Sequence, residues 1–448
     1  MLQNVIEVTK QTRAIGDDAQ GLEALYATLG EQGQADAFAQ AIHTLYAQAE
    51  ENLLYAAWHY RLNTLLKTTV AVAPPEQSRV AWLVAIGLGL LNGLLFWLLS
   101  DFQQVTILDR VPLLPLIAAP LYATLMMGFV SLTTRRQWAR WAVCVGLLVV
   151  AVLYVIGMAV WRGDRTMQGS VSMLQMIHLP ALAWFAVGLY LLWDSPTPFA
   201  RFAGVIKSVE AVITAGLFLA AGGVFTALTF GLFTTLTLEP PVWMIRLFAA
   251  GGLGLVPLLA VAAVYRPELP PALQIFAQGL SKLIALILRL LLPLTLLVAV
   301  VYIVLIPANF MQPFQHRESL IVYNAMLFAI IGLLVGATPV QANDLSPGLR
   351  MWLRRCLLAL VCLTLIVAFY AMAAILYRTW QDGWTPNRLA VIGWNVINIS
   401  ILALLLYRQR RTTDWLSAIH ATISTGLSWY ALWSLLLVLL LPWLFGGI

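Results

Sequence analysis

Charged side chains are scarce in this sequence, since Asp, Glu, Lys and Arg together make up 10% of its 448 residues. Soluble domains usually carry about 25% charged residues, so the scarcity excludes an ordinary water-soluble protein. Apolar residues reach 61% and gather in long runs after residue 75. Runs of about 20 apolar residues are long enough to cross a hydrocarbon core of roughly 30 Å. The composition therefore predicts a chain that lies mostly within a membrane.

Cysteine is nearly absent and histidine is sparse. Cys144, Cys356 and Cys362 lie in apolar runs without a CxxC or Cys-His spacing, so neither a disulfide framework nor a metal site is indicated. The five histidines, none with a partner four residues away, are His43, His59, His178, His316 and His420. The nucleophile and metal motifs GxSxG and HExxH are also missing. We therefore expect no catalytic centre, no metal and no cofactor.

The long apolar runs indicate helices. A membrane β-barrel would require short strands of alternating polarity, but LRLLLPLTLLVAVVYIVLI at residues 288–306 is apolar on nearly every side. The sequence predicts an all-α fold, a polytopic transmembrane helical bundle of about eleven spans. The spans are expected at residues 80–99, 111–132, 142–160, 173–193, 209–236, 242–265, 283–306, 319–337, 353–377, 387–407 and 419–445.

Basic residues are divided unevenly among the predicted loops. Lys and Arg in short loops stay cytoplasmic, and a cytoplasmic N-terminus places 19 of the 26 on that side. The other seven are Arg110, Arg162, Arg165, Arg246, Arg317, Arg378 and Arg388. An odd number of spans then puts the C-terminus outside. Topology and attraction to anionic lipid account for the net charge of +6, so we expect the lipid bilayer as a partner and no nucleic acid.

Residues 1–67 differ from the rest of the chain. They contain eight acidic and four basic residues, a net charge of −4, and their apolar residues recur at helical spacing. The two apolar faces consist of Leu22, Leu25 and Leu29, and of Phe38, Ile42, Leu45 and Tyr46. We predict a small cytoplasmic helical hairpin at 1–67, a linker at 68–79 and a membrane domain at 80–448. The hairpin either packs on itself or on the basic loops, or it binds a partner protein; the oligomeric state stays open.

A polar island, RTWQDGWTPNRLAVIGW at residues 378–394, separates the ninth and tenth predicted spans. Thr385 followed by Pro386 is typical of a helix start, because a hydroxyl caps free amides and proline suits the first helical position. Gly383 offers a tight turn just before it. The island therefore predicts a short hairpin connection on the outer side of the membrane.

The same island resembles a signature of the bacterial membrane proteins known as domain of unknown function 4153: an Arg, a short gap, Gly-x-Thr-x-Asn-Arg and an apolar stretch with Trp. The matching residues are Arg378, Gly383, Thr385, Asn387, Arg388 and Trp394. IHLPALAW at residues 177–184 resembles a second segment of that family. Family members usually have Tyr at the position of Asp382 and an acidic residue at that of Pro386. The resemblance covers residues 80–448 and implies a protein of the bacterial cytoplasmic (inner) membrane, without implying a chemistry.

Two interpretations of the island's charges remain open. Asp382 is close enough in sequence to pair with Arg378 or Arg388, and these groups together can hold the hairpin. Alternatively, the two arginines form an outer-face site for a carboxylate or phosphate.

Other ionisable residues lie near the membrane interior, where burial costs a few kcal/mol and function is suspected by default. They are Glu210, Arg246 and Arg289. Each lies close to a predicted span end, where an arginine can reach the interface and Glu210 can pair with Lys207 one turn back. Coupling to an ion or proton is the alternative.

Three classes of function are compatible with these features. A non-enzymatic accessory, sensor or scaffold subunit of a membrane complex suits almost purely apolar spans and an added cytoplasmic unit. A small-solute or ion transporter suits the number of spans, but such proteins usually carry polar residues at mid-membrane and repeated halves, and the spans show neither pattern. A membrane enzyme would need a cluster of acid, base or metal ligands. The sequence favours the accessory role.

Overall fold

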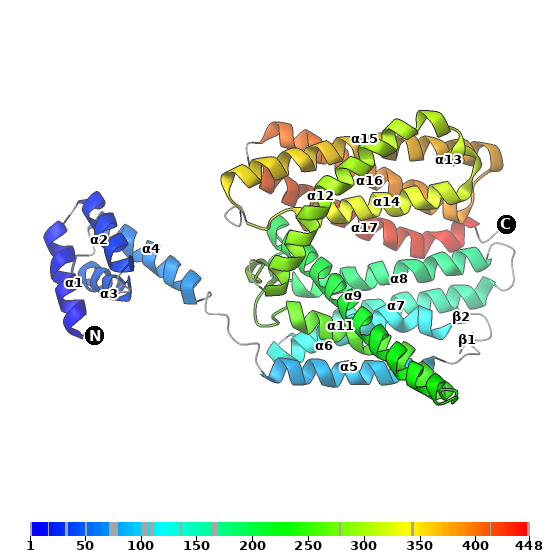
Figure 1. Cartoon of the computed structure of the whole chain (residues 1–448), viewed down its shortest axis with the longest axis horizontal. Helices are drawn as coiled ribbons and strands as arrows, with labels where there is room; N and C mark the ends of the chain where they lie inside the picture. Colours follow the sequence, from blue (N-terminus) through cyan, green and yellow to red (C-terminus); the bar gives the residue numbers. More distant parts are fainter. Residues whose placement is uncertain are drawn as a thin grey trace. The chain divides into compact units, whose positions relative to one another are not determined.

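The computed structural model describes residues 2–16, 18–31, 35–49, 52–70, 79–100, 106–107, 111–134, 137–162, 168–276, 279–341, 345–412 and 414–445. The chain divides into two compact units, Met1–Ser78 and Arg79–Ile448, which are described separately (Figure 1). Most of the predicted linker at 68–79 falls on residues 71–78, which lie outside the described residues. The last helix of the first unit reaches Val70, and the first helix of the second begins at Arg79.

The N-terminal unit contains four helices where the sequence predicts a hairpin. They are α1 Leu2–Ile15, α2 Ala19–Glu31, α3 Ala35–Gln48 and α4 Leu53–Val70. The stretch predicted as one second helix is divided at Asn52, whose Oδ1 accepts hydrogen bonds from the backbone N–H groups of Leu54 and Tyr55 at 2.9 and 3.1 Å. This cap starts a new helix. The predicted apolar faces meet in one core, in which Leu22, Phe38 and Ile42 are fully buried.

The second unit holds eleven helices long and apolar enough to cross a membrane among its described residues. The chain is therefore a polytopic membrane protein, and the predicted all-α bundle is confirmed. The spans are α5 Arg79–Leu99, α6 Leu113–Thr134, α7 Trp138–Arg162, α8 Gln168–Leu191, α9 Pro198–Thr235, α10 Val242–Arg246 with η1 Leu247–Gly251 and α11 Gly252–Val264, α12 Gly279–Leu305, α14 Arg317–Ala337, α15 Pro347–Asp382, α16 Pro386–Arg411 and α17 Trp415–Phe445. The short elements are strands β1 Thr106–Ile107 and β2 Val111–Pro112, the turns η2 Pro271–Leu273 and η3 Pro307–Asn309, and α13 Gln312–Gln315.

Two spans begin well before their apolar runs. Helix α9 starts at Pro198, where the Thr197 hydroxyl accepts from the Ala200 N–H at 3.2 Å, and α15 starts at Pro347. The fixed φ of proline suits the first position of a helix, so each helix begins at its proline and not at the start of the apolar run. Helix α9 has 38 residues, about 57 Å at ~1.5 Å per residue, so it must tilt to stay within a bilayer. Figure 1 shows α9 and α12 crossing the other membrane helices obliquely.

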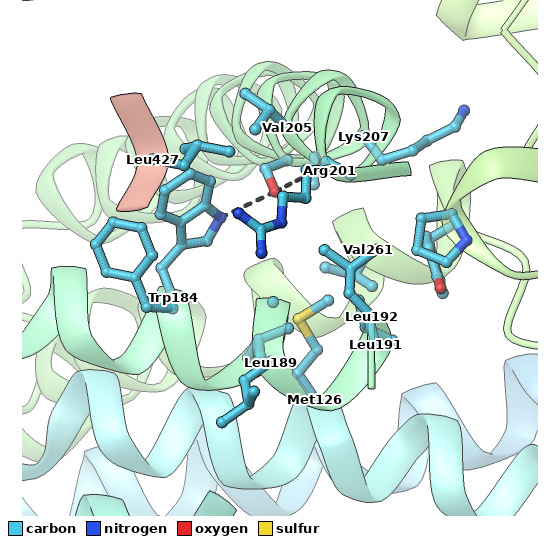
Figure 2. A pocket seen from close by; sticks show the side chains of 18 of the residues that line it. Met126, Trp184, Leu189, Leu191, Leu192, Arg201, Val205, Lys207, Val261 and Leu427 are labelled. Carbon is cyan, nitrogen blue, oxygen red and sulfur yellow. Dashed lines mark hydrogen bonds between the residues drawn. The ribbon is translucent and has the colours of Figure 1, made fainter. Parts of the chain in front are cut away.

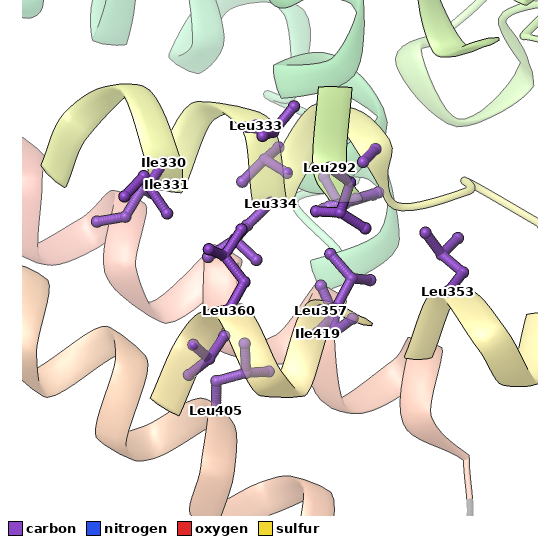
Figure 3. Packing of buried hydrophobic residues seen from close by; sticks show 14 of the residues in the cluster. Leu292, Ile330, Ile331, Leu333, Leu334, Leu353, Leu357, Leu360, Leu405 and Ile419 are labelled. Carbon is purple, nitrogen blue, oxygen red and sulfur yellow. The ribbon is translucent and has the colours of Figure 1, made fainter. Parts of the chain in front are cut away.

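Two large clusters of buried apolar residues hold the membrane unit together. One joins α5, α6, α7, α8 and α11 around Met127 and Tyr190. The other joins α9, α12 and α14 to α17, where Leu292, Leu334 and Leu360 lie close together (Figure 3). Because lipid tails are as apolar as leucine, close van der Waals packing rather than removal of water stabilises such contacts.

Glycine permits a close contact between the backbones of α5 and α11. A Cβ added to Gly254 would lie 2.7 Å from the Asn92 carbonyl oxygen and 2.7 Å from the Gly93 Cα, and one added to Gly93 would lie 2.8 Å from the Gly251 oxygen. The buried Asn92 side chain donates to the Gly254 carbonyl at 2.7 Å. Small residues at this crossing thus allow the two backbones to touch.

Candidate functional site

The polar island forms the connection between α15 and α16. Helix α15 ends at Asp382, and Gly383 follows with φ +83°, a left-handed conformation that suits glycine. Helix α16 begins at Pro386, and the Thr385 hydroxyl accepts from the Arg388 N–H at 3.3 Å. The helix start thus lies where the Thr-Pro pair predicts it.

The Arg388 side chain stabilises this connection through two hydrogen bonds. Its guanidinium donates to the Asp382 carboxylate at 2.6 Å and to the Gly383 carbonyl at 2.7 Å. Arg378 forms no ion pair in the described part of the chain, and its buried Nη1 has no hydrogen-bond partner there. Of the three charged residues expected to act together, the structure joins two. Asn387 is exposed.

Glu210 lies in a buried network on α9 and α12. Lys207 Nζ lies 2.7 Å from the Glu210 carboxylate and also donates to Ser281 Oγ at 3.0 Å and to the Ile275 carbonyl at 2.6 Å. The Ser281 hydroxyl donates to the same Glu210 oxygen at 2.6 Å. Both charged side chains are 4% exposed. The pairing one turn back is as predicted, and each charge has compensating partners, as buried ion pairs require.

Arg246 and Arg289 each donate to a backbone carbonyl near the end of another helix. Arg246 Nη2 lies 2.8 Å from the Trp97 oxygen near the end of α5. Arg289 Nε lies 3.2 Å from the oxygen of Ala337, the last residue of α14. Carbonyls at helix C-termini lack partners within the helix and attract cations. These two arginines therefore act as caps between helices.

A polar cluster in the middle of the spans is the strongest candidate site. His178 of α8 and Trp394 of α16 stack at 5.7 Å between ring centroids, and the indole N–H donates to His178 Nε2 at 3.1 Å. His178 Nδ1 lies 2.7 Å from the Leu174 carbonyl. Because a carbonyl only accepts and an indole N–H only donates, the imidazole is neutral with its proton on Nδ1. Both segments that resemble the known family thus meet at one hydrogen bond.

Further polar side chains surround this pair. The Trp394 ring lies 5.4 Å from that of Tyr430 on α17, and the Tyr430 hydroxyl lies 2.5 Å from Asn398 Oδ1. Gln175, one turn before His178, donates to the Val438 carbonyl at 2.8 Å. Asn395 follows Trp394 directly on α16, and Ser434 lies one turn after Tyr430 on α17. We call His178, Trp394, Tyr430, Asn398, Gln175, Asn395 and Ser434 the midspan polar cluster. All but Trp394 and Tyr430 are at least nine-tenths buried.

Several atoms of the midspan polar cluster have no hydrogen-bond partner among the described residues. They are Gln175 Oε1, both side-chain polar atoms of Asn395, Asn398 Nδ2 and Ser434 Oγ. An unpaired buried polar group is destabilising by about 1–3 kcal/mol, and native proteins keep few of them. The midspan polar cluster therefore holds hydrogen-bond donors and acceptors that the described residues leave unused.

The expectation of spans without polar residues at mid-membrane is wrong, and a sequence signal for the cluster exists. Gln175 and His178 are three residues apart, Asn395 and Asn398 are three apart, and Tyr430 and Ser434 are four apart. Each spacing places a polar pair on one helix face. Nothing in the sequence indicates that these three faces meet.

No family model, curated protein sequence or solved structure matches this chain.

Proposed function

We propose that this protein is a non-enzymatic accessory, sensor or scaffold subunit of a membrane complex in the bacterial inner membrane, with a cytoplasmic N-terminus. The observation that carries the proposal is the N-terminal unit, which has its own core of buried side chains and a net charge of −4 over residues 1–67. A separate helical unit joined to a membrane bundle is suited to binding another protein.

One face of α4 supplies a surface for such binding. Leu53 is 87% exposed and Tyr60 is 64% exposed, and Ala57 between them is also exposed. Their spacing of four and three residues places them on one side of the helix. Leu and Tyr exposed in a row on a soluble helix are typical of a surface that a partner covers. We call these three residues the α4 stripe.

The test compares proteins that co-purify with four forms of the chain from native membranes. The forms are the full chain, a chain lacking residues 1–67, a Leu53→Glu/Tyr60→Glu variant of the α4 stripe, and an Ala27→Glu control at an exposed position of α2. We expect a stoichiometric partner to be lost from the truncated and stripe variants and retained by the control. A photo-crosslinking residue at position 57 should attach to the same partner.

Identical partners in all four samples would contradict the proposal. The truncated chain should still insert, because each span carries its own apolar signal. Insertion therefore serves as the internal control that separates loss of the partner from loss of the membrane domain.

We further propose that the chain is a relative of the proteins known as domain of unknown function 4153. Support comes from the contact between the two resembling segments, which meet at His178 and Trp394 although 216 residues separate them. Segments that share a site are constrained together, whereas chance likenesses have no reason to touch. The proposal predicts that relatives with the island's motif carry His and Trp at these two positions.

Transport of a small solute is the second candidate, and the midspan polar cluster favours it. Hydrogen-bonding groups from three helices near the middle of a membrane bundle are typical of a solute site. The test is uptake of labelled small polar solutes into vesicles that contain the purified protein. Transport through the cluster predicts that Asn398→Leu abolishes uptake while Ser400→Ala, on the same helix, leaves it unchanged. Equal uptake in both variants, or none in the wild type, would rule out this candidate.

A further inference from the structure

A cavity of about 1100 Å³ lies beside α9, between α8, α11 and α17. Its walls are almost entirely apolar and include Trp184, Leu189, Val205 and Val261 (Figure 2). Trp184 fixes α8 against α9, because its indole N–H donates to Ser208 Oγ at 2.9 Å. The cavity is much larger than a single water molecule requires.

The cavity opens toward the side of the bundle that faces lipid. Trp184 and Leu189 of α8 and Val212 of α9 all line it, and they are 37%, 47% and 71% exposed. Small residues make the space: a Cβ added to Gly188 or Gly216 would meet nothing within 4 Å. A molecule moving sideways in the bilayer can therefore enter without passing through water.

One cation remains uncompensated in this apolar space. Figure 2 shows the Arg201 guanidinium among Trp184, Met126 and Val261, whereas the Lys207 side chain extends away from them. Lys207 is already paired with Glu210 at 2.7 Å. Arg201 Nη1 donates to Ser428 Oγ at 3.1 Å, and no carboxylate of the described residues lies within 4.0 Å of Arg201. A guanidinium in such surroundings binds oxyanions through parallel N–H donors.

The position of Arg201 along α9 matches the headgroup level of a bilayer. It is in the first turn of a helix that begins at Pro198, and Trp193, which also lines the cavity, is 43% exposed in the preceding segment. Trp and Arg at a span end are typical of the membrane–water interface. From Arg201 the lining residues of α9 continue to Leu219, about 27 Å further along the helix axis at ~1.5 Å per residue.

We propose that this cavity is a binding site for an anionic phospholipid of the bilayer. The headgroup phosphate binds the Arg201 guanidinium and the Ser428 hydroxyl, and one acyl chain lies along α9 past Gly216. The charge of Arg201 selects an anionic headgroup, and the apolar walls require a lipid chain rather than a soluble anion. This site is independent of both the α4 stripe and the midspan polar cluster.

The test is native mass spectrometry of the whole purified protein after incubation with phosphatidylglycerol, phosphatidylcholine of the same chains, or glycerol phosphate alone. We expect one tightly held phosphatidylglycerol, and weaker binding of the zwitterionic lipid and of the chainless headgroup. Arg201→Gln removes a charge-assisted hydrogen bond to the phosphate, so it should weaken phosphatidylglycerol binding by about tenfold or more.

Filling the cavity supplies a second variant. Gly216→Leu places a side chain in the open space of the cavity. It should abolish lipid binding without moving the surrounding helices. Gly222→Leu lies further along α9, also with nothing within 4 Å, and does not line the cavity. Arg410→Gln removes an exposed arginine at the end of α16 that does not line the cavity. Both controls should bind phosphatidylglycerol like the wild type, and all four variants should melt near the wild-type temperature.

The opposite results would overturn the proposal. Equal retention of phosphatidylcholine and phosphatidylglycerol would remove the role of Arg201. Undiminished binding by Gly216→Leu would place the lipid elsewhere, and tight binding of glycerol phosphate alone would identify an anion site with no need for a chain.

Discussion

Three arginines of the membrane unit bind backbone carbonyls at the ends of helices. Arg246, Arg289 and Arg388 each donate to a carbonyl at or near a helix C-terminus, those of Trp97, Ala337 and Gly383. The last carbonyls of a helix have no intrahelical donor and carry partial negative charge. A cation there needs no carboxylate to be stabilised. Arg388 adds one, Asp382, and so joins the end of α15 to the start of α16.

The first prediction concerns Arg388. Arg388→Ala removes both the ion pair and the hydrogen bond to Gly383, and should lower the free energy of unfolding in detergent by about 1–2 kcal/mol. A double-mutant cycle with Asp382→Ala should return a coupling of about 0.5–1 kcal/mol, because the Asp382 side chain is 56% exposed and solvent screens the pair. Unchanged melting combined with loss of an anion response would instead support an outer-face anion site.

A second prediction concerns His59 of the N-terminal unit. Burial, with the nearby His43 as a smaller cause, lowers the pKa of His59 below its ordinary value of 6.5; the two rings lie 4.3 Å apart. As pH falls through 6.5, His59 is protonated in the unfolded chain before it is protonated in the folded unit. The free energy of unfolding should therefore decrease over this range, and the decrease should end below the pKa of His59 in the folded unit. Thermal melting of residues 1–78 between pH 8 and 5 measures this.

His59→Asn should flatten that part of the pH profile. Glu23 does not interfere, because the hydrogen bond from Arg61 lowers the pKa of Glu23 below 4.5 and its contribution is lost only in more acidic solution. If the melting temperature of His59→Asn still falls with pH near pH 6, another group is responsible.

Helix pairs in this protein differ in how closely they approach, and glycine decides the difference. Gly93 and Gly254 lie where the backbones of α5 and α11 touch, whereas Gly222 and Gly223 on α9 have nothing within 4 Å. The sequence alone does not distinguish such glycines, because small residues are common at helix contacts and elsewhere in spans. Only the positions at a crossing constrain the structure.

The third prediction uses two glycines of α11 two residues apart. Gly254→Ala places a Cβ 2.7 Å from backbone atoms of α5, while Gly252→Ala meets nothing within 4 Å. We expect Gly254→Ala to destabilise the protein by about 1–3 kcal/mol, the usual effect of overpacking. Gly252→Ala should be neutral or slightly stabilising, because alanine favours the helix over glycine. Equal melting of the two variants would contradict the close contact.

The whole molecule combines a helical unit that carries negative charge with a membrane bundle that carries a positive excess. The first 67 residues have a net charge of −4, within a chain of net charge +6. Residues 68–448 therefore carry +10. Positive charge near a membrane favours contact with anionic lipid headgroups. The distribution of basic residues among the loops also predicts the orientation of the bundle.

The fourth prediction is a cytoplasmic N-terminus and an external C-terminus. Eleven spans put the two ends on opposite sides, and the positive-inside rule selects which is which. Fusions to alkaline phosphatase, active only outside, and to green fluorescent protein, fluorescent only inside, measure this at each end. A C-terminal fusion that fluoresces would show a different number of spans or the reverse orientation.

The spans and several helix starts are predictable from sequence because their causes are local. An apolar run of sufficient length predicts a span wherever it occurs, and Thr385 with Pro386 predicts a helix start within a few residues. The ties from Arg388 to Asp382 and from Lys207 to Glu210 bridge six and three residues, so sequence proximity is enough. The caps at Asn52 and Thr197 are equally local, since each side chain accepts from a backbone N–H two or three residues later.

The contacts between spans are different, because in a bilayer the faces toward lipid and toward protein are both apolar. Hydrophobic periodicity, which marks the buried face of a soluble helix, therefore does not reveal which faces meet. Packing alone brought His178 to Trp394 and Arg246 to the end of α5. Packing also left the space beside Gly188 and Gly216 empty, so the midspan polar cluster and the cavity around Arg201 exist only in the folded bundle.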